Sequence, residues 1–371
     1  MVIVDLVRQT TETSKLKQRF KETAVNMKPG TYALSPDLKL IYRVDADTIR
    51  NVSRYFGLEH ERAEVSFNGR RVYLNLGNPT CKIEKNAKNN GGGTVYYVMT
   101  SAEGPGKAEA KVFNFEEEEV LTLFGRDHDV YKYAANDTYF RDFFQLTEVN
   151  AIDLENRICS EQFVPFMRKK DWTFAHYDKV TARLFSNYYE YAQTCGEEIS
   201  VSYGNIKAKL ARISSDRAFT ETAALLDAAI PELVKRKPFP HIRQHGNMQS
   251  DNILICCDDD DKIYFTGWDQ SMKYLLGFDL FHWFQDEIDE RSEPHKIGLI
   301  DYFHGDFDPY FDKLFRAFGL YYNDYSRKTL YFMYLTEKIY RKELVKSRPD
   351  KKRSALMHNE LIERIKNLEL S

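Results

Sequence analysis

The chain has 371 residues, of which 43% are hydrophobic, and it contains 25 Phe and 24 Tyr. This length exceeds the size at which a single hydrophobic core usually stops growing, so we expect two lobes or domains. The 53 basic and 56 acidic residues leave a net charge of −3. No overall field therefore favours nucleic acid or an anionic membrane surface as a partner.

The cysteines and the chain start indicate the cellular setting. The five cysteines are an odd, scattered set without the paired spacing of a zinc site, which is typical of a reducing compartment: Cys81, Cys159, Cys195, Cys256 and Cys257. The first residues lack the basic region and the apolar length of a signal peptide, and no run approaches the ~20 apolar residues of a membrane span. We expect a cytoplasmic protein.

Residues 1–80 contain no motif. A polar helix-like stretch over 10–21 precedes strand-like runs at 38–43 and 71–76. This region is either an accessory region or a set of extra strands on the first lobe.

From residue 81 the pattern predicts strands over 81–87, 94–100 and 108–113. A glycine triplet, 91–93, separates the first two, and a turn at 103–107 separates the last two. The acidic run 116–119 is followed by Val120, Leu121, Leu123 and Phe124, whose spacing predicts a helix. A further strand is expected within 156–165.

The second half is predicted to be mainly helical. The residues Val180, Leu184, Tyr188 and Tyr191 mark one helix face, and 215–230 reads as another helix ending at Pro231. Between the helices, residues 253–269 read as a hairpin. Its four aspartates, 258–261, are best explained as a solvated turn rather than as a metal site.

Two motifs in residues 245–281 resemble small-molecule kinases. In aminoglycoside phosphotransferases, choline kinases and their relatives a catalytic loop reads His-Gly-Asp, four residues, then Asn-Ile-Leu. Here His245 and Asn252 fall in that register within His-Gly-Asn-Met-Gln-Ser-Asp-Asn-Ile-Leu. The family also places Phe-Asp-Leu or Tyr-Asp-Leu so that its Asp follows the hairpin Trp by eleven residues, and here Asp279 follows Trp268 at that distance.

The resemblance covers roughly residues 80–340 and implies an α+β, bilobal, protein-kinase-like fold of the aminoglycoside-phosphotransferase type. Its β-rich N-lobe would span 81–165 and its mainly helical C-lobe 166–371, with 1–80 as an accessory region or N-lobe extension. Protein kinases fit less well, because no Asp-Phe-Gly or Ala-Pro-Glu segment occurs.

The resemblance also implies a site for ATP and magnesium. The loop Gly91, Gly92 and Gly93 would approach the phosphates, and Lys111 would pair with them. That lysine would be held by a carboxylate from the following helix, Glu117 or Glu118. Backbone groups of the hinge, from Glu161 to Val164, would bind adenine. Within the loop, Asn252 would be a metal ligand, while Asp279 would brace the loop and receive a hydrogen bond from His245.

Two departures from the family pattern affect activity. Asn247 stands at the position of the base Asp, and Gly267 at that of the metal-binding Asp. A general base typically contributes ~10²–10⁴ in rate, whereas losing the metal carboxylate removes the clamp for the ion that neutralises the phosphates. Asp269 could compensate if 265–269 form a strand, and Asp251, next to Asn252, is a second catalytic candidate.

Three functions remain open from the sequence. The favoured one is a pseudokinase with a binding or scaffold role and a possible protein partner. The second is an atypical ATP-dependent phosphotransferase acting on a sugar or other small-molecule hydroxyl. The third is a nucleotidyl transferase, because Met-Gln-Ser-Asp-Asn is similar to a string in the selenoprotein-O-like proteins.

Overall fold

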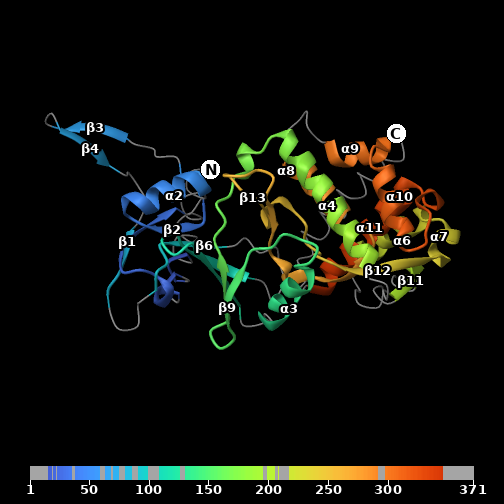
Figure 1. Ribbon diagram of the computed structural model, residues 1–371, viewed down its shortest axis with the longest axis horizontal. Coiled ribbons are helices and arrows are strands. Elements are labelled where there is room, and N and C mark those ends of the chain that lie inside the picture. Colours follow the sequence, from blue (N-terminus) through green and yellow to red (C-terminus); the bar gives the residue numbers. More distant parts are fainter. Residues whose placement is uncertain are drawn as a thin grey trace.

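A computed structural model shows the chain as two lobes, a sheet-rich one and a helical one (Figure 1). It describes residues 16–18, 20–21, 23–35, 38–58, 63–67, 70–74, 80–85, 91–98, 108–125, 130–194, 199–204, 208, 217–290 and 297–345. The predicted turn at 103–107 lies outside these residues. In the described part, the α+β class and the division into a β-rich and a helical lobe are confirmed.

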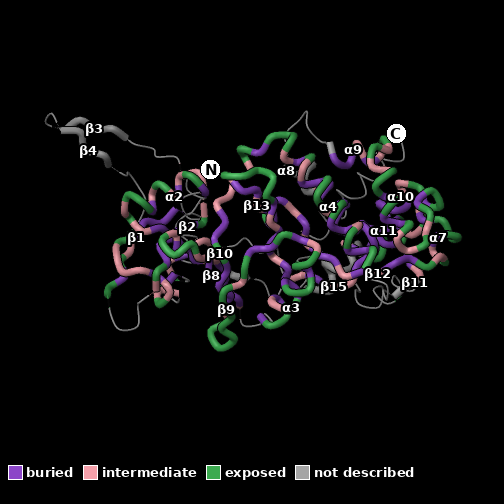
Figure 2. The backbone as a smooth tube through the Cα atoms, in the orientation of Figure 1, coloured by how far each residue is buried: buried purple, intermediate pink, exposed green. Residues whose placement is uncertain are grey.

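The first lobe is built on one eight-stranded sheet whose neighbouring strands are all antiparallel. Its strands, in spatial order, are β5 (Thr80–Ile83), β1 (Gly30–Ser35), β2 (Leu40–Arg43), β6 (Val95–Val98), β7 (Ala108–Asn114), β8 (Glu119–Phe124), β10 (Ile158–Gln162) and β9 (Val149–Asp153). A separate hairpin joins β3 (Ala63–Phe67) and β4 (Arg70–Leu74). Figure 2 shows the β9 end of the sheet as exposed.

Strands β1, β2 and β5 extend this sheet beyond β6. Helix α2 (Ala46–Phe56) follows β2. It begins at Asp45, whose side chain accepts a hydrogen bond from the Thr48 N–H at 2.9 Å, and it ends at Gly57, whose φ of 72° is in the left-handed region. A short 3-10 helix, η1 (Ala24–Asn26), precedes β1.

The helix predicted after residue 119 is wrong. Residues 119–124 form strand β8, which lies between β7 and β10 and is covered on both faces: Val120 packs in one hydrophobic cluster and Leu123 in another. A strand buried on both faces shows a continuous apolar run, which cannot be distinguished from a short buried helix by periodicity. The first helix after these strands is α3 (Val130–Phe140).

The order of strands matches a kinase N-lobe when its first strand is β6, one strand later than the predicted first strand over 81–87. Three strands, β6, β7 and β8, precede helix α3, and two strands, β9 and β10, follow it. The chain then leaves β10 through residues 163–168 into the second lobe, where the Met167 N–H donates to the Ile255 carbonyl at 2.8 Å.

The second lobe is mainly helical, as predicted. Its helices are α4 (Phe174–Thr194), α6 (Arg217–Ala229), α7 (Glu232–Arg236), α8 (Phe278–Glu290), α9 (Ile297–His304), α10 (Asp308–Arg316) and α11 (Arg327–Val345). The sheet β11 (Ile199–Ser202), β12 (Pro238–Gln244) and β15 (Met272–Leu275) and the hairpin β13 (Ile253–Ile255) and β14 (Ile263–Phe265) complete it.

One large aromatic core fills the helical lobe. The predicted stripe on α4 is buried in it, and Trp268 stacks on Phe140 of α3 with ring centroids 4.2 Å apart. This contact joins helix α3, which follows the strands β6 to β8, to the second lobe at Trp268. Among the described residues, we find no helix with the length and apolar character needed to span a membrane.

Candidate functional site

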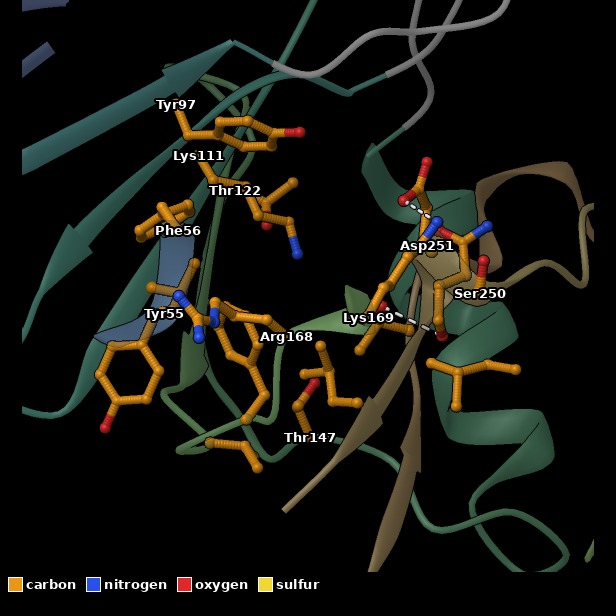
Figure 3. A pocket seen from close by; sticks show the side chains of 18 of the residues that line it. Tyr55, Phe56, Tyr97, Lys111, Thr122, Thr147, Arg168, Lys169, Ser250 and Asp251 are labelled. Atoms are coloured by element: carbon orange, nitrogen blue, oxygen red, sulfur yellow. Dashed lines mark hydrogen bonds and ion pairs between the residues drawn. The ribbon is translucent and has the colours of Figure 1, made fainter. Parts of the chain in front are cut away.

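A cavity of about 620 Å³ lies between the lobes. Its roof consists of side chains from α2, β6, β7, β8 and β10, and its floor of residues 247–254 and 266–270. Figure 3 shows Tyr97, Lys111 and Thr122 on one side and Lys169, Ser250 and Asp251 on the other. This cleft contains most of the predicted site residues.

The loop 245–252 is fixed from behind by Asp279, as predicted. The fully buried carboxylate of Asp279 accepts the backbone N–H groups of His245 at 2.6 Å and Gly246 at 2.8 Å, and also the Tyr188 hydroxyl. Burial raises the pKa of Asp279 to about 6, although these three donors and its place in the first turn of α8 favour the charged form.

The His245 side chain is buried behind the loop rather than exposed in the cleft. Its Nδ1 accepts the Asn247 N–H at 3.1 Å, so its Nε2 carries the proton and donates to the Thr266 carbonyl at 2.7 Å. Burial lowers the pKa of His245 to about 4, so the ring is neutral at pH 7. His245 therefore positions the loop and the start of residues 266–270, and it does not reach the cleft.

Asn247, Asn252 and Gly267 lie together on the floor. The Asn252 side-chain amide donates to the Asn247 carbonyl at 2.7 Å. A Cβ at Gly267 would lie 2.6 Å from Asn252 Oδ1, so residue 267 faces the cleft beside Asn252. The register that places Gly267 at the metal position is consistent with this geometry, but its φ of 79° favours glycine.

The strand geometry predicted for residues 265–269 is wrong. Strand β14 ends at Phe265, Gly267 is left-handed, and residues 268–270 form the 3-10 helix η4 (Trp268–Gln270). Glycine allows this turn at the position where the chain leaves the hairpin. Asp269 lines the cleft, but from this turn and not from a strand.

Asp251 forms a salt bridge. Its carboxylate lies 2.6 Å from the Lys169 ammonium, which comes from the segment that connects the lobes (Figure 3). The neighbouring Arg168, Lys169 and Lys170 all line the same end of the cleft. Asp251 is thus held at the cleft mouth among cations.

Lys111 reaches the cleft from β7, opposite Thr122 of β8 (Figure 3). In protein kinases the phosphate-binding lysine belongs to the third strand, paired with a glutamate of the following helix. By strand order the third strand is β8, where Thr122 faces the cleft. The roof lysine Lys111 therefore comes from the preceding strand.

Glu161 and Val164 lie where the sequence predicted, at the passage from β10 to the second lobe. Glu161 is only 3% exposed. Its carboxylate accepts hydrogen bonds from Thr122 Oγ1 at 2.7 Å, Tyr133 Oη at 2.9 Å and Thr147 Oγ1 at 3.0 Å. These groups form a polar closed end to the cleft.

The glycine triplet and the paired glutamates lie outside the cleft. The N–H groups of Gly91 and Gly93 donate to the Val25 and Asn26 carbonyls, and Cβ atoms on the triplet would collide with Asn26, Asn114 and Val112. The triplet is therefore explained by close packing against η1 and β7. Glu117 and Glu118 are exposed in the β7–β8 turn and cannot hold Lys111 from a helix.

Sequence analysis missed several residues of the cleft. Tyr55 and Phe56 of α2 line its outer side, and Thr122, Tyr133 and Thr147 surround Glu161. A single hydroxyl or aromatic residue in a sequence does not indicate a binding site. These residues come together only because the sheet folds and helix α3 packs beside it.

Comparisons with known proteins find only distant similarity. No family model and no curated protein sequence matches the chain. Solved structures of similar fold include choline kinase LicA from Streptococcus pneumoniae, with 10% identity and a TM-score of 0.40 over 68% of this chain and 88% of that one. Amicoumacin kinase hAmiN, in complex with AMP-PNP, Ca²⁺ and Ami, has 9% identity and a TM-score of 0.46 over 72% and 88%. The GDP complex of aminoglycoside 2′-phosphotransferase-IIIa has 11% identity and a TM-score of 0.46 over 74% and 93%.

Proposed function

We propose that this protein is a nucleotide-binding pseudokinase whose cleft holds ATP with little dependence on magnesium. One observation carries the proposal: the cleft has a lysine, Lys111, in its roof, whereas positions 247 and 267 of its floor are Asn and Gly. A lysine attracts a polyphosphate without a metal ion. The base and the metal carboxylate of a phosphotransferase have no equivalent at those two positions.

The donor set of the floor fits a magnesium ion poorly. Magnesium in kinase sites is bound through one or two carboxylates together with the substrate phosphates. Asn252 offers only a neutral amide oxygen, and Asp251 is paired with Lys169 at 2.6 Å. Asp269 is the other floor carboxylate that lines the cleft. A binding or scaffold role that depends on the occupied cleft is the function we infer.

The experiment is a calorimetric titration of the full chain with ATP, in magnesium and in EDTA, for the parent, Lys111→Met and Lys82→Met. Lys82 is an exposed lysine of β5 in the same sheet and serves as the matched control. We expect ATP affinities within about threefold in the two buffers, and a loss of at least about tenfold for Lys111→Met, because one charge-assisted contact is worth ~1.5–3 kcal/mol. Absence of binding, or equal affinity for Lys111→Met and the parent, would reject the proposal.

An atypical phosphotransferase is the second candidate, because Asn252 and Asp269 line one cleft. ATP hydrolysis needs no knowledge of the acceptor and so tests it directly. Magnesium-dependent ATP turnover that collapses in Asp269→Asn, with unchanged thermal stability, would favour this candidate over the pseudokinase. A nucleotidyl transferase would instead transfer AMP to protein or a small molecule, which radiolabelled ATP would detect.

A further inference from the structure

The closed end of the cleft contains a buried carboxylate whose partners are all neutral. Glu161 is 3% exposed, and its three hydrogen bonds come from hydroxyl groups on three elements: Thr122 on β8, Tyr133 on α3 and Thr147 ahead of β9. Among the described residues, no Lys, Arg or His lies within salt-bridge distance of it. Burial of a carboxylate is costly unless hydrogen bonds compensate for lost water.

The three hydroxyl groups leave one hydrogen-bond acceptor position of the Glu161 carboxylate unused. An ionised carboxylate accepts about four hydrogen bonds. Oε1 accepts from Tyr133 and Thr147, while Oε2 accepts from Thr122 alone. One acceptor position therefore remains on Oε2, and since Glu161 lines the cleft, a bound ligand can supply the donor.

The chemistry of this end discriminates between donors and acceptors. Because Thr122, Tyr133 and Thr147 direct their hydrogens at Glu161, this end presents a negatively charged acceptor to the ligand. An amino group placed there gains a charge-assisted hydrogen bond, whereas a carbonyl oxygen is repelled. Adenine and hypoxanthine have nearly the same shape but reversed hydrogen-bonding patterns: at position 6 adenine has an amino donor and hypoxanthine a carbonyl acceptor, whereas at N1 adenine has an acceptor and hypoxanthine an N–H donor. A carboxylate that faces position 6 therefore selects adenine.

We propose that the Glu161 side chain makes the cleft selective for adenine nucleotides by accepting a hydrogen bond from the 6-amino group of the base. The position of Glu161 supports this, because it directly precedes residues 162–164, which connect the lobes and also line the cleft. The inference rests on the proposed nucleotide binding. It adds the identity of the base and the side chain that selects it.

The test compares ATP with ITP on the parent and on Glu161→Gln, by calorimetry in EDTA. We expect the parent to bind ATP at least about tenfold more tightly than ITP, since a hydrogen bond to a charged group contributes ~1.5–3 kcal/mol. In Glu161→Gln the side-chain amide can donate to a carbonyl or accept from an amino group, so the ratio should fall to within about threefold. GTP, which also has a carbonyl at position 6, should follow ITP.

The outcomes separate this inference from the function on which it rests. If neither ATP nor ITP binds the parent, the proposed function fails and the inference fails with it. If both bind with equal affinity, or GTP binds more tightly than ATP, only the selection by Glu161 is rejected. The ratio on the parent decides this even if Glu161→Gln does not fold.

Discussion

The floor and the roof of the cleft are built in different ways. The floor comes from one stretch of the chain, 247–270, whose loop is fixed from behind by Asp279 and by the buried neutral His245. The roof collects side chains from separate strands, among them Lys111, Thr122 and Glu161. The floor lacks a carboxylate at 247 and at 267 but keeps its loop geometry, and the roof supplies the cation. Under the proposed function, nucleotide binding and metal binding are therefore separate properties of one cleft.

The largest effect is expected on the floor, from Asp279→Ala. This change leaves two buried backbone N–H groups and the Tyr188 hydroxyl without their acceptor, so the free energy of unfolding should fall by about 3–5 kcal/mol. Urea unfolding measures it. The control is Asp312→Ala, which removes a surface pair with Arg316 and should cost less than about 1 kcal/mol. Equal losses in the two variants would contradict the bracing role.

The pH dependence of stability tests the two residues that fix the floor loop, His245 and Asp279. Because the folded pKa of His245 is lowered from 6.5 to about 4, its contribution to stability is complete above pH 6.5 and is lost as pH falls towards 4. The raised pKa of Asp279, about 6 instead of 3.8, acts in the opposite direction over nearly the same range: its contribution is present below 3.8 and is lost as pH rises through 6. The two contributions nearly cancel in the parent.

The variant Asp279→Asn should reveal the contribution of Asp279 to the pH dependence of stability. The difference in unfolding free energy between the parent and Asp279→Asn should grow by about 3 kcal/mol as pH falls from 7 to 4, because about 2 pKa units correspond to that energy. Urea unfolding of both proteins at intervals across this range measures it. A difference that does not change with pH would show that Asp279 titrates at an ordinary pKa in the folded protein.

The packing of the glycine triplet in the first lobe is tested by Gly91→Ala. A Cβ at residue 91 would lie 2.0 Å from the Asn26 backbone carbon, so η1 must move and the protein should lose about 1–3 kcal/mol of stability. ATP affinity of the folded protein should stay within about twofold of the parent. Gly204→Ala, whose nearest neighbour would be 3.6 Å away, is the control and should be nearly neutral. A selective loss of ATP affinity would restore the phosphate-binding role predicted for the triplet.

The bracing of the floor loop could be predicted because its residues belong to motifs with a fixed spacing. His245, Asn252 and Asp279 lie in one motif-bearing stretch, and spacing alone aligned them with the kinase pattern. The bracing by Asp279 was predicted from that alignment and is confirmed by its contacts with His245 and Gly246. The turn at Gly267 was not predicted, because a single glycine after a strand does not reveal a left-handed conformation.

The roof was harder to predict for a physical reason. Four of the six residues in 119–124 are apolar and they lie on both faces, and such a run is compatible with either a helix or a doubly buried strand. That choice shifted the kinase strand order by one and gave Glu117 and Glu118 a role that their turn excludes. The Glu161 cluster was also beyond reach, since Thr122 and Glu161 are 39 residues apart and meet only in the folded sheet. The domain boundaries stay a prediction.

The smallest effect concerns the connection between the two walls. Helix α2 belongs to the roof, but Arg54 lies 3.4 Å from the Asp258 carboxylate and 2.9 Å from Cys257 Sγ in the hairpin of the other lobe. Both charged side chains are more than half exposed. Exposed pairs contribute ~0.2–1 kcal/mol and are screened by salt.

A double-mutant cycle with Arg54→Ala and Asp258→Ala should therefore give a coupling within that range at low salt and close to zero in 1 M NaCl. A coupling above about 1 kcal/mol, or one that salt does not change, would show that this link fixes the roof to the floor. The expected small value instead leaves the two walls joined by the segment that follows Glu161 and by the stacking of Trp268 on Phe140.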